Sequence, residues 1–78
     1  MKIVEVVWRD STSLSGHISK ETAVGQITVI RRNTGYVIDD TENDITLVSG
    51  IIDFKPCEYD RAITIHKGCV ESIREIGE

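Results

Sequence analysis

The chain has 78 residues and a formal net charge of −4, from 13 acidic and 9 basic side chains. This length fits one small domain with little room for a deep enzyme cleft inside one subunit, which leaves pockets between subunits open. The acidic balance argues against non-specific binding of nucleic acid. No apolar run is long enough to span a membrane, and the first ten residues do not resemble a signal peptide. The two cysteines are expected to be free thiols in a reducing cytoplasm.

The composition predicts a protein built mainly of β-strands. Ile, Val and Thr together occupy 27 of the 78 positions, whereas Leu and Ala occur only twice each. β-Branched side chains lose rotamer freedom in a helix and fit the pleated surface of a sheet. Runs of such residues, separated by polar or Gly-containing turns, predict five strands, at residues 2–8, 26–40, 45–53, 61–65 and 70–76.

The first strand is almost continuously apolar, which indicates a strand that is covered on both faces or lies in an interface. A Ser- and Thr-rich segment follows at residues 10–19. Ser19 is then placed to cap a short helical turn through residues 20–24, and Gly25 is placed to end it. The long second strand is expected to bend near Gly35, because a glycine inside a strand often marks a bulge or a sharp bend.

Five short, bent strands with one short helical turn after the first strand predict a small barrel of the SH3-like or Sm-like kind. A single domain is expected to span residues 1–78. Long free sheet edges invite pairing with other chains, so we expect either closure of the barrel or a homo-oligomer. The apolar first strand favours the homo-oligomer.

The chain contains residue types used in catalysis and metal binding, but not in patterns that support either. Asp10, Ser15 and His17 would suffice for a catalytic triad, yet nothing resembles the glycine pattern of a nucleophile elbow. Hydroxyl groups in turns usually bond to the backbone instead. The two histidines and two cysteines match no metal-ligand spacing. We therefore expect no enzyme activity, no metal and no cofactor.

Anion recognition is the chemistry that the residues favour. Arg9 follows Trp8, Arg31 lies in the second strand, and Lys67 occupies a tight turn whose backbone N–H groups can converge on an anion. Trp8 or Tyr36 would stack on a base. The alternative is that Trp8 belongs to the core and that the arginines pair with surface carboxylates, namely Asp39, Asp40 and Glu42.

The Ser-rich segment joins no two domains, so we interpret it as a loop that contacts a ligand rather than as a linker. Ser13, Ser15, Gly16 and His17 have no evident structural role in it. The predicted ligand-binding residues are therefore Trp8, Arg9, Ser13, Ser15, Gly16, His17, Arg31, Tyr36 and Lys67.

Three stretches of the chain together resemble a family of small uncharacterised phage and prophage proteins: "VEVVWRDSTSLSGHIS", "TGYVIDDTENDITLV" and "ITIHKGCVESIREI". His17 departs from that family's pattern, which has an aromatic residue there, usually Trp, and His66 stands where the family has Pro. The resemblance implies a viral or prophage origin and a small β-barrel, but by itself no function. The residues that carry it are Trp8, Asp10, Ser11, Ser15, Gly16, Gly35, Tyr36, Ile65, Lys67, Gly68 and Cys69.

Two hypotheses about function follow. The first is a phage counter-defence protein, an oligomeric sponge that sequesters a nucleotide-derived immune signal without cleaving it, in the cytoplasm of the infected bacterium. The ligand would be a cyclic nucleotide or an ADP-ribose derivative, held at a subunit boundary. The alternative is an SH3-like or Sm-like module that binds RNA or a host protein, although the acidic balance counts against RNA. Neither hypothesis involves a membrane.

Overall fold

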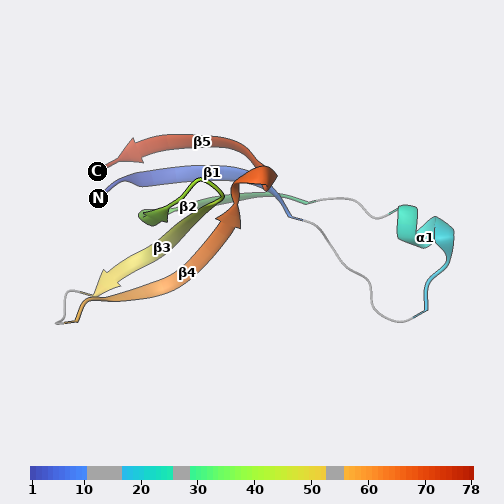
Figure 1. Cartoon of the computed structure of the whole chain (residues 1–78), viewed down its shortest axis with the longest axis horizontal. Coiled ribbons are helices and arrows are strands. Elements are labelled where there is room, and N and C mark those ends of the chain that lie inside the picture. Colours follow the sequence, from blue (N-terminus) through green and yellow to red (C-terminus); the bar gives the residue numbers. More distant parts are fainter. Residues whose placement is uncertain (11–16, 26–28, 53–55) are drawn as a thin grey trace.

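The computed structural model describes residues 1–10, 17–25, 29–52 and 56–78. Figure 1 shows the strands gathered at one end of the molecule and a short helix at the other. The elements are β1 (Ile3–Asp10), α1 (Lys20–Val24), β2 (Val29–Asp40), β3 (Asp44–Ile52), β4 (Glu58–His66), the 3₁₀-helix η1 (Lys67–Cys69) and β5 (Val70–Gly77).

The five strands form one antiparallel sheet in the order β4-β3-β2-β1-β5. β4 and β5 follow each other in the chain but occupy opposite edges of the sheet, and they do not pair. The prediction of a mainly β protein with five strands is confirmed, whereas the prediction of a closed barrel is wrong. The physical reason is that the bend of the sheet does not bring its two edge strands within pairing distance.

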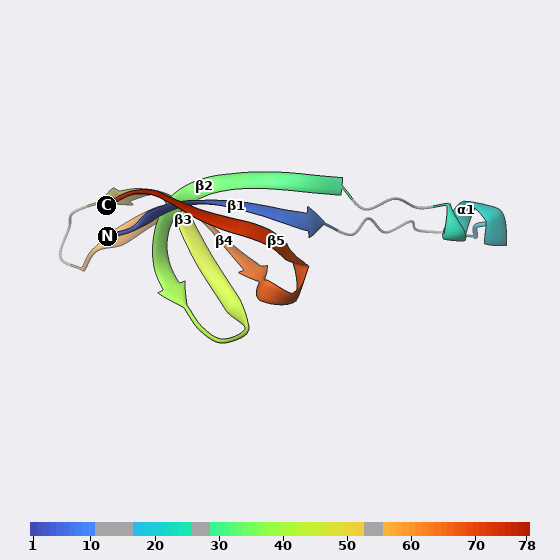
Figure 2. The ribbon, with the colours of Figure 1, turned by 90° about the horizontal axis from the view of Figure 1, so that it is seen from above.

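β2 is curved (Figure 2) and belongs to two parts of the sheet, which meet at Tyr36, next to Gly35. Its first part, from Val29 to Tyr36, pairs with β1, and its last part, from Tyr36 to Asp40, pairs with β3. A Cβ atom at Gly35 would lie 2.6 Å from the backbone oxygen of Val48. Only glycine therefore lets β3 approach β2 this closely. Figure 2 shows the curve of β2 from above.

The core lies between the two halves of the bent sheet. Val4 and Val6 of β1 pack there against Ile45, Leu47 and Ile65 of β3 and β4. Their neighbours on the opposite face of β1, at positions 3 and 7, are only half-buried. β1 is thus covered more completely on one face than the other, and the core is small.

Two elements differ from the sequence prediction. β4 begins at Glu58 rather than at residue 61, because the end of β3 is long enough to pair with it, through Ile51↔Tyr59 and Ile52↔Glu58. The tight turn after β4 is a 3₁₀-helix. His66 caps its start, because His66 Nδ1 accepts the Gly68 N–H at 3.0 Å, and the Val70 N–H donates to the Lys67 carbonyl oxygen at its end.

The helix α1 occupies the segment in which the sequence predicts a helical turn. The Gly25 N–H donates to the Glu21 carbonyl oxygen at 2.9 Å and closes the last turn. None of the described helices is long and apolar enough to cross a membrane.

Candidate ligand-binding site

The predicted ligand residues of the Ser-rich segment are only partly described. Ser13, Ser15 and Gly16 lie outside the described residues. His17 is exposed and precedes α1, which both views place away from the sheet (Figures 1 and 2). His17 is therefore not brought together with the predicted residues of the strands.

The predicted arginines form ion pairs on the surface of the sheet. Arg9 pairs with Glu71 of β5, and Arg31 pairs with Asp10 of β1. The carboxylates thus come from neighbouring strands and not from the acidic end of β2 and its turn, where the sequence suggested them. Both guanidinium groups already have an anionic partner.

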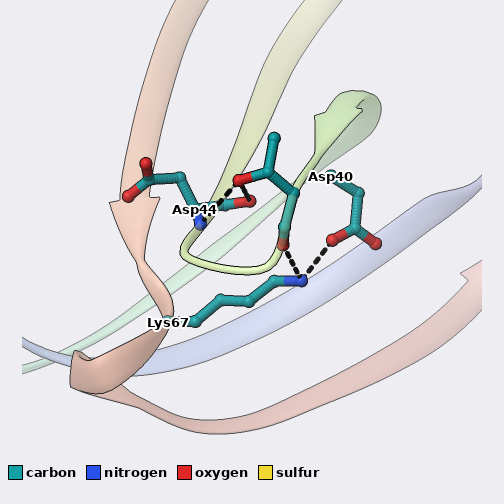
Figure 3. Close-up of polar contacts among 4 residues, drawn as sticks. Asp40, Asp44 and Lys67 are labelled. Carbon is teal, nitrogen blue, oxygen red and sulfur yellow. Dashed lines mark hydrogen bonds and ion pairs between the residues drawn. The ribbon is translucent and has the colours of Figure 1, made fainter.

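Lys67 joins two turns at one end of the sheet (Figure 3). Its Nζ donates to the Asp40 carboxylate and to the Thr41 carbonyl oxygen, while its backbone N–H donates to the Asn43 carbonyl oxygen at 2.7 Å. Thr41 Oγ1 accepts the Asp44 N–H at 3.0 Å within the same turn. Lys67 therefore ties η1 to the turn between β2 and β3, and its ammonium group is occupied.

Trp8 packs on the core side of β1. Its indole contacts the hydrophobic core, and its Nε1–H donates to Asn33 Oδ1 at 2.7 Å. Tyr36 pairs in register with Ile3, which alternates with the core-facing Val4, so it lies on the opposite face of the sheet. The two predicted stacking residues are thus separated by the sheet.

A pocket of about 280 Å³ lies where β2 and β3 diverge. Past the Tyr36↔Val48 pair, β2 continues along β1 while β3 continues along β4, so the two strands open into a fork. We call this pocket the fork pocket. It is lined by Asn33, Thr34, Leu47, Val48, Ser49, Arg61, Ala62 and Ile63.

Arg61 is the distinctive residue of the fork pocket. Its φ is 49°, and it is the one non-glycine residue with positive φ among those described. Such a backbone costs an L-residue of this kind roughly 1–3 kcal/mol and often occurs at functional sites. Arg61 lies opposite Ser49, whose Oγ donates to the Asp60 carbonyl oxygen at 3.2 Å.

Arg61 also differs from most cations of the protein in its electrostatic surroundings. Of the nine Lys and Arg residues, Lys55 lies outside the described ranges, and six of the remaining eight form ion pairs with carboxylates. Within the described ranges, only Lys20 and Arg61 form none. Arg61 is therefore the one described cation that both lines a pocket and lacks a carboxylate partner.

Sequence reasoning missed the fork pocket. Arg61 lies at the start of the predicted fourth strand, and no residue type next to it in the sequence predicts a positive φ. The pocket also depends on the divergence of β2 from β3, which follows from strand register rather than from any motif. The sequence feature that comes closest to predicting this divergence is Gly35, at which a bend of the second strand is expected.

The chemistry of the fork pocket is that of binding. Its described lining includes a guanidinium, two hydroxyl groups, one amide and four apolar side chains, but no His, Cys, Asp or Glu. No described cluster of His, Cys, Asp and Glu could hold a metal ion. Comparisons with protein-family models, curated proteins and solved structures found no match to this chain.

Proposed function

We propose that this chain is a non-catalytic binding protein that sequesters a phosphate-bearing, nucleotide-derived ligand, with a phosphate of the ligand held in the fork pocket. In the phage setting that the sequence resemblance implies, this is the counter-defence role. The observation that supports the proposal most directly is Arg61, a cation without a carboxylate partner among the described residues, held at positive φ in a polar pocket.

The lining suits a phosphate group. A guanidinium donates two parallel hydrogen bonds to phosphate oxygens, and charge-assisted bonds of this kind are about twice as strong as neutral ones. Thr34 and Asn33 add neutral donors from β2. The Trp8 indole N–H fixes the oxygen end of the Asn33 amide, so Trp8 acts as a positioning residue for this side chain.

The size of the pocket limits what it holds. About 280 Å³ is near the lower end of small-molecule pockets, which start at roughly 300 Å³. A phosphate with part of its sugar fills that space, and the rest of a nucleotide must lie outside the fork. The apolar side chains of Ala62 and Ile63 provide the surface against which the sugar packs.

The same lining supports the proposal of binding without cleavage. General acid–base chemistry needs a titratable side chain within hydrogen-bond reach of the reacting group. The described lining offers none near neutral pH, since Arg61 stays protonated. We therefore expect a bound nucleotide to be released unchanged.

The test is a binding titration with a defined panel of probes: pyrophosphate, cyclic dinucleotides and cyclic ADP-ribose isomers. The chain has a single tryptophan, Trp8, and it contacts Asn33 of the pocket, so its fluorescence reports binding. Thermal shift at about 100-fold excess over the dissociation constant gives an independent measure, because such saturation adds about 2.7 kcal/mol of stability. Arg61→Ala is compared with Arg74→Ala, which removes an exposed, ion-paired arginine outside the pocket.

The expected result is that at least one nucleotide probe binds, that R61A weakens it by about 10- to 100-fold, and that R74A changes it less than about threefold. Chromatography of the denatured complex should return the probe intact. The proposal fails if no probe binds the wild-type protein, if R61A and R74A bind equally well, or if the probe is cleaved. Salt-dependent binding of single-stranded RNA in place of these probes would favour the alternative module instead.

A further inference from the structure

The segment that contains α1 projects from the sheet. We call the described residues 17–25 the arm. Both views place α1 well beyond the ends of the strands (Figures 1 and 2). Two apolar side chains of the arm are exposed, Val24 to 74% and Ile18 to 43%. A helix of five residues is not stable in water by itself, because nucleation is costly and packing must supply its stability.

The dimensions of the chain also indicate that it leaves more surface uncovered than a compact monomer does. Its radius of gyration is 15.9 Å, whereas a compact domain of this length has about 12 Å. Its accessible surface is 5965 Å², whereas a folded monomer of its mass exposes about 4,700 Å². The excess, about 1,200 Å², exceeds the roughly 800 Å² that each partner buries in a stable protein interface.

An apolar surface that could receive the arm lies on the edge strand β5. Ile73 is 44% exposed although it pairs with Val6, the most completely buried residue of the core. Ile76 on the same strand is 48% exposed. These side chains lie at the open edge of the sheet, where closure of a barrel would have covered them. The chain thus presents an uncovered apolar arm and an uncovered apolar edge.

We propose that the arm of one copy packs on β5 of a second copy, covering Ile73 and Ile76 with Ile18 and Val24. The occupant is a second copy because both apolar surfaces belong to this chain in equal numbers, and because the whole chain exposes about 1,200 Å² more than a compact monomer of its mass, which leaves enough surface for an interface of about 800 Å² per partner. Each copy has one arm and one β5, so two copies bury both sets by exchanging arms. This contact does not depend on the ligand.

The test is light scattering with size-exclusion chromatography at about 100 µM protein. Val24→Asp places a charge on the arm, and Ile76→Asp places one on β5. Tyr59→Asp is the matched control, since Tyr59 is 45% exposed on the opposite edge strand, β4. Circular dichroism confirms that each variant keeps its sheet. We expect the wild type and Y59D to be oligomeric, and V24D and I76D to be monomeric.

Mixing the two variants separates this contact from packing of arm against arm. V24D keeps an intact β5 and I76D keeps an intact arm, so their equimolar mixture contains one complete contact per pair and should form heterodimers. Arm-to-arm packing predicts instead that I76D stays oligomeric and that mixing restores nothing. A monomeric wild type, an oligomeric V24D, or a mixture that remains monomeric would overturn the proposal.

Discussion

At the scale of single residues, Arg61 combines backbone strain with an exposed charge. The strain lies in the backbone of Arg61, so replacement by glycine should relieve it, whereas alanine should retain it. We expect Arg61→Gly to be more stable than Arg61→Ala by about 1 kcal/mol, because a left-handed backbone costs an L-residue about 1–2 kcal/mol. Urea denaturation measures the difference.

The control for this comparison is another exposed position of the same strand. Glu58 lies in β4 and does not have a positive φ. In an ordinary strand, glycine destabilises relative to alanine by roughly 0.5–1 kcal/mol, so E58G should be less stable than E58A. The same order of stability at both positions would show that Arg61 is not strained. Both Arg61 variants are expected to lose ligand binding.

Trp8 and Asn33 form the second residue-scale unit, which connects the core to the fork pocket. Asn33→Ala removes the acceptor of the partly buried indole N–H, and an unpaired buried donor costs about 1–3 kcal/mol. Because the indole is only partly buried, we expect a loss of about 1–2 kcal/mol, with a shift in Trp8 fluorescence. Thr34→Ala, at the next residue, should cost less than about 0.5 kcal/mol. Equal losses for the two variants would contradict a structural role for the Trp8–Asn33 bond.

At the scale of elements, the bend of β2 determines both the core and the fork. Gly35→Ala would place a Cβ atom 2.6 Å from the Val48 backbone oxygen, which cannot move without displacing β3. We expect a loss of about 1–3 kcal/mol in the free energy of unfolding. Gly50→Ala is the control, because there the nearest atom, at 2.9 Å, is in the flexible Asp60 side chain. G50A should cost less than about 1 kcal/mol; a cost equal to that of G35A would contradict the steric argument.

The elements themselves could be predicted from the sequence because their signals are local. β-Branched runs marked the five strands, and Gly35 marked the point where β3 approaches β2 closely. That β4 and β5 remain unpaired at opposite edges of the sheet could not be predicted, since closure of a barrel depends on how far the whole sheet curls rather than on any residue. Ion pairing of the arginines was only the alternative to ligand binding, and with other carboxylates: Arg31 pairs with Asp10, which is distant in sequence and adjacent only through the register of β1 and β2.

At the scale of the whole molecule, most described cations are neutralised by neighbouring carboxylates and are not free to attract a polyanion. Three carboxylates of β1 and β5 pair with cations that a polyanion would otherwise contact: Glu5, Glu71 and Glu75. The described surface therefore lacks the unpaired row of cations that tracks a nucleic-acid backbone. This favours a small ligand in a discrete pocket over RNA.

The small core and the contact proposed between copies together predict that stability depends on assembly. Only six apolar residues among those described are buried, so a single copy gains little from its own packing, and the proposed contact with a second copy would stabilise the folded state by mass action. We expect the melting temperature of the wild type to rise by about 3–6 °C for each tenfold increase in protein concentration. That of V24D should not change, because a monomer unfolds independently of its concentration. Differential scanning calorimetry between about 10 and 1,000 µM protein measures how the melting temperature of each protein changes with concentration. A wild-type melting temperature that does not vary with concentration would show that one copy folds on its own.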